Sequence, residues 1–383
     1  MKKYKIENLC TVRSSKRIFA NQYTNDGIPF YRGKEITLLS LGQKISDLLY
    51  INDKAYDDIK INGVPKENDI LITAVGTIGS VWLIDHNAPF YFKDGNIIWL
   101  SFINADIVLP KYLKYLLTSS AFQRKIEEIS IGSNQKALTI DALKKQEIEV
   151  PILNIQQHIV DILGSIDNSI ENNEFLIKKT NDFLADLFLK YSAKATDYKR
   201  LDEICSIITK GTTPTTLKRS FVDYGVPFVK VESLTDSHQI DTNKLAFIDT
   251  ETHEMLQRSK LKYKDLLISI AGTIGRFALV PKTMPQANTN QAVALVRGSI
   301  VSQEYLYALF LSGLCDEQIK AKTVQAVQAN LSLSVIGSLS VPYILDNTFN
   351  KQINSLYEYI ENLAEKNNKL YELKQLYLHK FFG

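Results

Sequence analysis

Apolar residues recur at alternating steps of four and three along a long segment in the middle of the chain. Between Asn154 and Tyr191 there is no proline and only one glycine, Gly164. This heptad pattern predicts a long helix with one narrow apolar seam. At about 1.5 Å per residue, the helix is on the order of 55 Å long. The seam positions are Ile159, Leu163, Ile166, Ile170, Ile177, Leu184, Leu187 and Tyr191.

A second seam follows the same plan 190 residues later. Its positions are Phe349, Ile353, Leu356, Ile360, Leu363, Leu370, Tyr377 and Phe381. Asn173 and Thr180 interrupt the first seam, and Asn367 and Lys374 interrupt the second. Polar residues in such a seam reduce stability but fix register and partner choice. We therefore treat these four residues as candidates for register control or partner contact.

The sequence before each helix is duplicated as well, which is the first property to look for in a chain of this length. The three clearest pairs are KIENLCTV (5–12) with RLDEICSI (200–207), GIPFYR (27–32) with GVPFVK (225–230), and DILITAVGTIGSV (69–81) with DLLISIAGTIGRF (265–277). The pairs keep their order and a nearly constant offset. We predict a globular unit at 1–152, a long helix at 153–192, a second globular unit at 193–344 and a second long helix at 345–383.

Each globular unit has the signals of a mixed α and β domain. Runs rich in β-branched and aromatic residues predict strands at Ile70–Val75, Val81–Ile84, Ile97–Phe102, Leu266–Ile270 and Ala292–Val296. One helix per unit is predicted, at Lys111–Glu128 and Gln303–Lys322. A strict alternation of strands and helices is absent, which argues against a doubly wound nucleotide-binding fold. The predicted fold class is α+β with an internal pseudo-twofold repeat.

Composition places the chain among ordinary globular proteins. It has 383 residues, 45% hydrophobic and 23% charged. There is no run of 18 apolar residues, so we expect no membrane span, and the basic N-terminus lacks the apolar core of a signal peptide. The three cysteines, Cys10, Cys205 and Cys315, show no paired spacing. We therefore expect a cytoplasmic protein.

No catalytic or metal-binding pattern is visible. The five histidines are scattered, and no Ser/His/Asp or paired-carboxylate arrangement recurs in both units. The chain lacks an adenine-methylating (N/D)PP(Y/F) motif and a nucleotide-hydrolysis loop. We predict a non-enzymatic protein without a cofactor of its own. A net charge of +3 is low for a protein that would neutralise many DNA phosphates alone. Either nucleic acid is not the ligand, or partner subunits supply part of the positive surface.

Polar clusters in predicted loops are the best candidates for a binding site. Asn and Gln can read adenine, and Arg or Lys can read guanine or contact phosphates. The two GTIG turns (76–79 and 272–275) are best interpreted as tight hairpins between buried strands, with contact to a phosphate as the alternative. The candidate DNA-binding residues are Arg17, Arg32, Lys34, Ser133, Asn134, Gln135, Lys136, Lys210, Thr212, Thr213, Lys230, Arg276, Asn288, Asn290, Gln291, Gln325, Gln328 and Asn330.

The whole chain resembles the specificity subunits of type I restriction–modification systems. The resemblance rests on KGTTPTT with GVPFVKVESL in the second unit, SSKRI with GIPFYRGKEI in the first, and the paired A-x-GTIG turns. It implies two target-recognition domains that each read one half of a split, asymmetric double-stranded DNA target. It also implies that the two long helices pair as an antiparallel coiled coil. Two methyltransferase subunits carrying S-adenosylmethionine would dock on the chain, and restriction subunits would join them.

Two other interpretations stay open at this point. The chain could be the specificity chain of a fused, type II-like restriction system with different partners. It could also be a coiled-coil scaffold that binds proteins and no DNA. Binding to libraries of random-target DNA distinguishes the scaffold from the two restriction-related alternatives.

Overall fold

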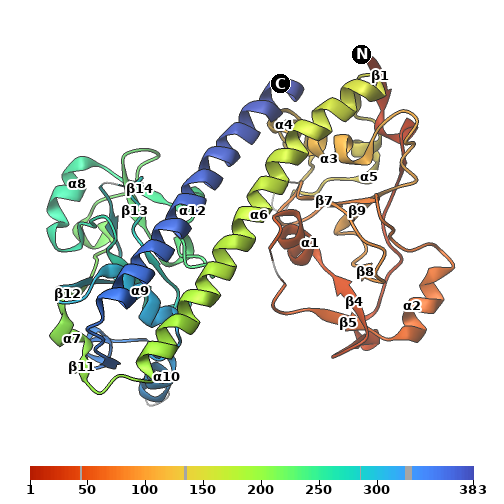
Figure 1. The fold of residues 1–383 in the computed structure, drawn as a ribbon. Coiled ribbons are helices and arrows are strands. Elements are labelled where there is room, and N and C mark those ends of the chain that lie inside the picture. The colour runs from red at the N-terminus through yellow and green to blue at the C-terminus, as the bar shows by residue number, and fades with distance from the viewer. Residues whose placement is uncertain (44, 133–135, 285, 324–329) are drawn as a thin grey trace. The chain divides into compact units, whose positions relative to one another are not determined.

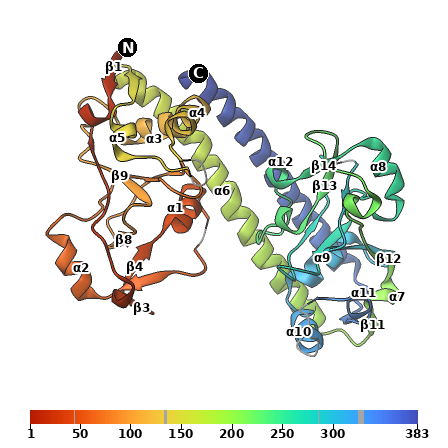
Figure 2. The ribbon, with the colours of Figure 1, turned by 180° about the vertical axis from the view of Figure 1, so that it is seen from behind.

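The computed structural model describes residues 1–43, 45–132, 136–284, 286–323 and 330–383. It divides into two compact units: unit 1 comprises residues 1–169 and 370–383, and unit 2 comprises residues 170–369. Two long helices, α6 (Leu153–Ser192) and α12 (Asn347–Phe382), are the most prominent elements of the ribbon (Figure 1; Figure 2 from behind). Because the division falls within both helices, each unit contains a globular part and one segment of each helix.

Unit 1 is built from short strands and short helices. Its strands are β1 Lys2–Lys5, β2 Thr11–Arg13, β3 Tyr23–Thr24, β4 Ile28–Tyr31, β5 Leu49–Ile51, β6 Ile70–Thr73, β7 Val81–Leu83, β8 Tyr91–Phe92, β9 Ile97–Ser101 and β10 Glu147–Val150. Its short helices are α1 Gly33–Ser40, α2 Asp53–Lys60, α3 Pro110–Thr118, α4 Ser120–Ile129 and α5 Ile140–Lys144. One antiparallel sheet has the order β2-β9-β6-β7, and a second has the order β3-β5-β4-β8, in which β4 and β8 are parallel. β1 pairs with β10.

Unit 2 repeats this plan. Its strands are β11 Tyr198–Arg200, β12 Cys205–Lys210, β13 Val226–Val229, β14 Ala246–Ile248, β15 Leu266–Ser269, β16 Phe277–Leu279, β17 Asn288–Thr289, β18 Val293–Gly298 and β19 Ser340–Pro342. Its short helices are α7 Leu201–Ile204, α8 Thr250–Met255, α9 Gln303–Leu311, α10 Asp316–Thr323 and α11 Leu333–Gly337. The main sheet has the order β12-β18-β15-β16, and the second, β14-β13-β17, again contains one parallel pair. The predicted α+β class and internal repeat are confirmed.

The continuous apolar runs at β6 and β15 arise because both faces of each strand are covered. In β6, Ile70 and Ile72 belong to the core beneath α3, whereas Leu71 faces an aromatic cluster that includes Trp82 and Trp99. In β15, Leu266 and Ile268 face one core and Leu267 another. The central strands thus separate two hydrophobic layers in each unit. The polar loops begin where these buried strands end.

The prediction of one helix per unit over 111–128 and 303–322 was wrong, because each segment forms two helices. Ser119 breaks the first: its backbone is extended, and its hydroxyl accepts a hydrogen bond from the Phe122 N–H (3.3 Å), which caps α4. Gly313, with φ +75°, lies between α9 and α10. Apolar periodicity continues across both breaks, so the pattern alone did not reveal them.

In each unit the two long helices pack antiparallel, as predicted. In unit 2, Asn173 donates from Nδ2 to Asn367 Oδ1 (2.7 Å), and the Tyr191 ring stacks on Phe349 with centroids 4.6 Å apart. In unit 1, the Lys374 ammonium lies 2.6 Å from the Asp167 carboxylate. The pairing of α6 with α12 is therefore formed within both units.

The seam is displaced by one residue at three of the predicted positions, one of which is Tyr377, where Leu378 is buried instead. Phe188 and Tyr357 are buried, whereas the predicted Leu187 and Leu356 are half-buried. Phe188 packs against Tyr305 of α9 (ring centroids 5.1 Å apart), so the globular part draws its ring into the core. The predicted seam residues that are buried are Ile159, Leu163, Ile166, Ile170, Ile177, Leu184, Phe349, Ile353, Ile360 and Leu363, and those that are half-buried include Tyr191, Leu370, Tyr377 and Phe381.

The three cysteines are free thiols. Cys10 and Cys315 are buried and Cys205 is half-buried. Burial is the main cause that raises the pKa of each thiol to about 12, and a neighbouring aspartate contributes in each case. Within the described ranges, no helix is both long enough and apolar enough to cross a membrane.

Candidate nucleic-acid interface

Both units place the A-x-GTIG turn at the end of the central strand of the main sheet. The turn joins β6 to β7 and β15 to β16, and both pairs are antiparallel. The hairpin interpretation is therefore confirmed. Gly76 and Gly79 have φ of +81° and +86°, and Gly272 and Gly275 have φ of +73° and +90°, a region that side chains with a Cβ disfavour. The glycines are thus needed for the shape of the turn.

A hydroxyl at the start of the turn holds it in both units. The Thr73 hydroxyl donates to the Thr77 carbonyl and accepts from the Ser80 N–H (2.9 Å). Ser269 does the same with the Thr273 carbonyl and the Arg276 N–H. Conservation of this arrangement between the units makes the turn a scaffold against which other segments are placed.

The predicted GSNQK loop and its counterpart end beside this turn. In unit 1, the Leu138 N–H donates to the Ala74 carbonyl (2.9 Å), and Lys136 is exposed just before it. In unit 2, the Leu331 N–H donates to the Ile270 carbonyl (2.9 Å), and Asn330 is exposed. Ser133, Asn134, Gln135, Gln325 and Gln328 lie outside the described residues.

In unit 1 the segment after β2 is tied to the segment after β8. The Ser14 hydroxyl donates to the Ile97 carbonyl (2.9 Å) and accepts from the Gly95 N–H (3.1 Å). The Lys16 N–H donates to the Tyr91 hydroxyl (2.8 Å), and the exposed Arg17 lies 4.0 Å from Asp94. The SSKR motif is thus positioned by its backbone, with its two cations at the surface.

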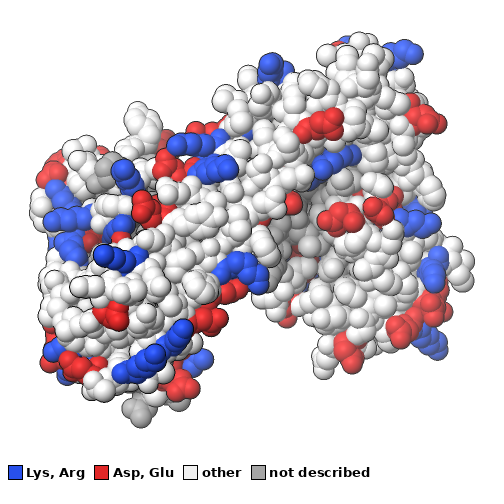
Figure 3. All heavy atoms as spheres, viewed as in Figure 1, with Lys and Arg blue, Asp and Glu red and all other residues white. Residues whose placement is uncertain are grey.

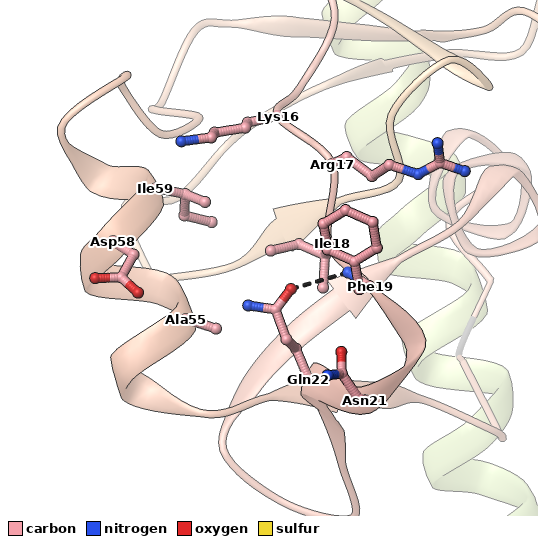
Figure 4. A pocket seen from close by; sticks show the side chains of 9 residues that line it. All are labelled: Lys16, Arg17, Ile18, Phe19, Asn21, Gln22, Ala55, Asp58 and Ile59. Carbon is pink, nitrogen blue, oxygen red and sulfur yellow. Dashed lines mark hydrogen bonds between the residues drawn. The ribbon is translucent and has the colours of Figure 1, made fainter.

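These two cations border a cleft of about 650 Å³ between the SSKR segment and α2 (Figure 4). Lys16 extends toward α2, which carries Asp58, whereas Arg17 extends to the opposite side. The cleft is lined by Lys16, Arg17, Ile18, Phe19, Asn21, Gln22, Ala55, Asp58 and Ile59.

A second cleft of unit 1, of about 510 Å³, lies against the GTIG turn. It is lined by Arg32, Gly33, Lys34, Thr37, Leu38, Val75, Gly76, Thr77, Lys93 and Asn96. Lys34 is exposed, and within the described part of the chain neither Lys34 nor Lys93 has a carboxylate in salt-bridge range. Lys93 and Asn96 were not among the candidates. The internal repeat contains the signal, since Lys93 aligns with Asn290 through the matching β4–β8 and β13–β17 registers.

Arg32 is anchored at the edge of this cleft. Its guanidinium makes two hydrogen bonds to the buried Glu35 (2.7 and 3.1 Å), and its N–H donates to the same carboxylate (2.8 Å). Burial acts to raise the pKa of Glu35, but the hydrogen bonds from Arg32 outweigh it, and the pKa lies below its ordinary value. The pair caps the start of α1 and fixes the guanidinium at the edge of the cleft, where Glu35 balances its charge.

In unit 2 the equivalent segments after β12 and β17 also meet. The Gly211 N–H donates to the Asn290 carbonyl (3.0 Å), and a Cβ at Gly211 would lie 1.7 Å from the Thr289 carbonyl oxygen. Only glycine fits there. Gln291 accepts from the N–H and hydroxyl of Thr213, Thr212 is half-buried, and Lys210 is exposed. The KGTTPTT motif and the end of the QANTNQ motif, Asn290 and Gln291, therefore lie together.

The remaining cations predicted in unit 2 have carboxylate partners. Lys230 lies 2.8 Å from Glu232. Arg276 donates to both oxygens of Asp236 (2.7 and 3.2 Å) and to the Leu234 carbonyl (3.3 Å). Asp236 is largely exposed, so its ion pair with Arg276 is open to solvent and screened by salt.

The structure places Asn288 in the interior, not at the surface expected of a base-reading residue. Its side chain is fully buried and donates to the Leu256 carbonyl (3.0 Å) and the Ser259 hydroxyl (3.2 Å), and its oxygen contacts His253. Its counterpart in unit 1 is the buried Tyr91. A fully hydrogen-bonded amide at a core position serves the scaffold.

The surface drawn in Figure 3 carries Lys and Arg side chains interspersed with Asp and Glu. No group of three His, Cys, Asp or Glu in the described part of the chain is arranged to hold a metal ion. The polar surfaces above offer cations, amides and hydroxyls, which are the groups that contact phosphates and base edges.

The chain is similar to known proteins along most of its length. The family model for the type I restriction modification DNA specificity domain matches twice, at residues 1–180 and 194–375. A candidate type I restriction enzyme specificity subunit from Haemophilus influenzae is 33% identical over 190 residues, which is 47% of this chain and 46% of the relative. The MjaIX specificity subunit of Methanocaldococcus jannaschii is 25% identical over 285 residues, 65% of this chain and 63% of the relative. The matched part of this chain thus spans less than two thirds of either relative.

A solved structure has the same fold. The crystal structure of a type I restriction–modification system S subunit from M. genitalium covers 100% of this chain and 96% of its own, with a TM-score of 0.56 and 18% sequence identity. At this identity the similarity concerns the fold alone.

Proposed function

This chain belongs to the type I restriction modification DNA specificity family, whose members are non-catalytic specificity subunits, and we propose that each of its units reads one half of a bipartite, asymmetric double-stranded DNA target. The asymmetry follows from the different side chains that the two units present at equivalent positions.

One observation carries the proposal. In unit 1, the segments after β4 and β8 line one cleft with the GTIG turn. In unit 2, Arg276 ties the segment after β13 to a turn of identical sequence, and the segments after β12 and β17 hydrogen-bond each other. The scaffold is duplicated, but the side chains differ, as in Lys34 against Glu232 and Lys93 against Asn290. A duplicated scaffold with divergent surface chemistry is what two readers of different half-sites require.

Partners complete the proposed activity. Two methyltransferase subunits, carrying S-adenosylmethionine, would dock on this chain and methylate adenine, and restriction subunits would join for cleavage in the cytoplasm. The chain itself would hold no cofactor. Contributions from the methyltransferase subunits to phosphate binding would also account for a net charge of only +3.

A methylation assay tests the proposal. The chain is purified with its methyltransferase partner and given a library of DNA in which all positions are randomised, and methylated adenines are then mapped. We expect one split motif with two different halves. Methylation without sequence preference, or with a single continuous motif, would contradict the proposal.

A further inference from the structure

The two long helices are so alike that each could in principle pair with a copy of itself. Their seams coincide after a shift of 190 residues. Large side chains also correspond near the C-terminal ends, where Phe188 of α6 matches Leu378 of α12 and Tyr191 matches Phe381. The spacing of the apolar seam positions alone therefore does not distinguish pairing of α6 with α12 from pairing between like helices of two molecules.

Two polar contacts break this similarity, one in each unit. In unit 2, Asn173 and Asn367 are both buried in the seam (5% and 6% exposed) and hydrogen-bond each other at 2.7 Å. Asn367 also approaches the Ile170 carbonyl (3.4 Å). In unit 1, Asp167 accepts from the Tyr115 hydroxyl (2.7 Å) and pairs with Lys374 at 2.6 Å, with both ionic side chains mostly buried.

The numbering of these contacts defines the alternatives. Facing residues of α6 and α12 have numbers that sum to about 540, as 173 and 367 do. Each residue of α6 corresponds to the residue of α12 whose number is higher by 190. If two α6 helices paired in the same register, the numbers of two facing residues would therefore sum to about 350. Asn173 would then face Ile177, and Asp167 would face Leu184.

Two α12 helices paired in the same register would also place polar side chains opposite apolar ones. Asn367 would face Leu363, and Lys374 would face Tyr357. Asn173, Asn367 and Lys374 would lose their partners inside an apolar layer, and Asp167 would keep only the Tyr115 hydroxyl. A buried polar group without a partner is strongly disfavoured, and one asparagine in a coiled-coil seam is enough to choose register and partner.

We infer that the Asn173–Asn367 pair, supported by Asp167–Lys374, makes the α6 surface specific for α12 and excludes pairing between identical helices of two molecules. The partner that fits the α6 seam is thus the other half of the chain. This inference concerns association alone and does not depend on the proposed reading of DNA.

The test cuts the covalent link between the two halves of the chain and keeps all of their native residues. A protease site is inserted into the connector at residues 193–197, and the complete chain is folded and then cut. The fragments are allowed to exchange in mild denaturant, and native mass spectrometry counts unlike and like pairs after the denaturant is removed. We expect the native sequence to give unlike pairs almost exclusively.

Two variants sharpen the test. In the first, Asn173→Leu with Asn367→Ile makes this layer identical to its pseudo-symmetric counterpart, and like pairs should rise at least about tenfold relative to unlike pairs. The second adds Ile177→Asn and Leu363→Asn. It has the amino-acid composition of the native chain, but the asparagine pair is moved to 177 and 363, whose numbers again sum to 540. It should restore unlike pairing.

Several outcomes would overturn the inference. They are abundant like pairs from the native sequence, unchanged pairing in the first variant, or like pairs in the second variant at the level of the first. The uncut chain supplies an independent measurement should a cut variant fail to fold. Asn173→Leu and Asn367→Ile should each lower the melting temperature alone, and the double change should recover most of the loss. Additive losses would mean that the two side chains are not coupled.

Discussion

The surfaces beside the GTIG turns are built on matching strands in the two units but differ in the pairing of their charged side chains. In unit 1, Lys34 and Lys93 line the cleft without a carboxylate in salt-bridge range among the described residues. At the equivalent positions unit 2 has Glu232, which pairs with Lys230, and Asn290. Its additional cation, Arg276, is held by Asp236 and replaces Ser80 of unit 1.

This difference predicts that the two units contact DNA through different kinds of interaction. Unpaired lysines attract phosphates whatever the base sequence, whereas amides and hydroxyls such as Asn290, Gln291 and Thr213 act at hydrogen-bond range. We therefore expect unit 1 to supply more of the salt-dependent affinity. Unit 2 would depend more on short-range contacts.

The largest effect is expected from exchanging a whole unit. Replacing residues 1–152 with the corresponding part of a relative that has another target should change one half of the methylated motif completely and leave the other intact. Mapping methylated adenines in cells checks this, and the reciprocal exchange of residues 193–344 is the control. If both halves changed, the units would not read independently.

The second-largest effect, on the free energy of unfolding, is expected from replacing a glycine of the GTIG turn with alanine. Gly79→Ala should destabilise unit 1 by about 2–3 kcal/mol, because φ is +86° and the new Cβ displaces Gln123 from its hydrogen bond to the Gly79 carbonyl. Gly275→Ala meets no neighbour and should cost unit 2 about 1–2 kcal/mol.

Both tryptophans lie in unit 1, so fluorescence-monitored urea unfolding reports that unit, and circular dichroism follows the whole chain. Equal losses for the two alanine variants would show that Gln123 contributes nothing to the turn.

A smaller effect is expected from neutralising the unit 1 lysines. Lys34→Gln with Lys93→Gln should lower the slope of log affinity against log salt by about 2, since each lost phosphate contact removes about one counterion. Fluorescence anisotropy with the methyltransferase complex measures the slope. Glu232→Gln, the matched change in unit 2, should leave the slope unchanged or raise it. An unaltered slope in the double variant would place these lysines away from the phosphates.

The smallest effect concerns pH. His238 of unit 2 stacks on Phe277 with ring centroids 4.1 Å apart, and burial lowers its pKa below 6.5. The unfolded chain therefore takes up a proton at a higher pH than the folded chain. The stabilisation is complete above pH 6.5 and is lost as the pH falls below that value. His238→Asn, which tolerates the positive φ of 61°, should flatten this part of the stability profile measured by denaturant unfolding.

Much of the architecture could be predicted from sequence because it repeats. The order of motifs revealed two units and two helices, and the seam residues indicated the helix pair. The sequence did not show that Phe188 and Tyr357 would replace Leu187 and Leu356, because the globular part of unit 2 forms a third side of the core there. Heptad periodicity describes two helices in contact and contains no information about a third packing element.

The candidate site was predictable by motif but not by residue. The polar loops were predicted as candidates from composition, and the structure adds that the described ends of two of them, at Lys136 and Asn330, lie beside the turn. Asn288 was misplaced because composition cannot distinguish a buried, fully hydrogen-bonded amide from an exposed one. Lys93 was missed because it follows a two-residue strand, β8, whose parallel pairing with β4 is a long-range contact without a local pattern.

The burial of Cys10 and Cys315 and the partial burial of Cys205 have a practical consequence. With thiol pKa values of about 12, their reactive thiolate forms are essentially unpopulated at neutral pH. A cysteine introduced at an exposed position, such as Lys34 or Asp236, would then react with maleimide dyes far faster than the native thiols. The unmodified chain is thus a suitable host for a pair of fluorophores, without prior removal of its own cysteines.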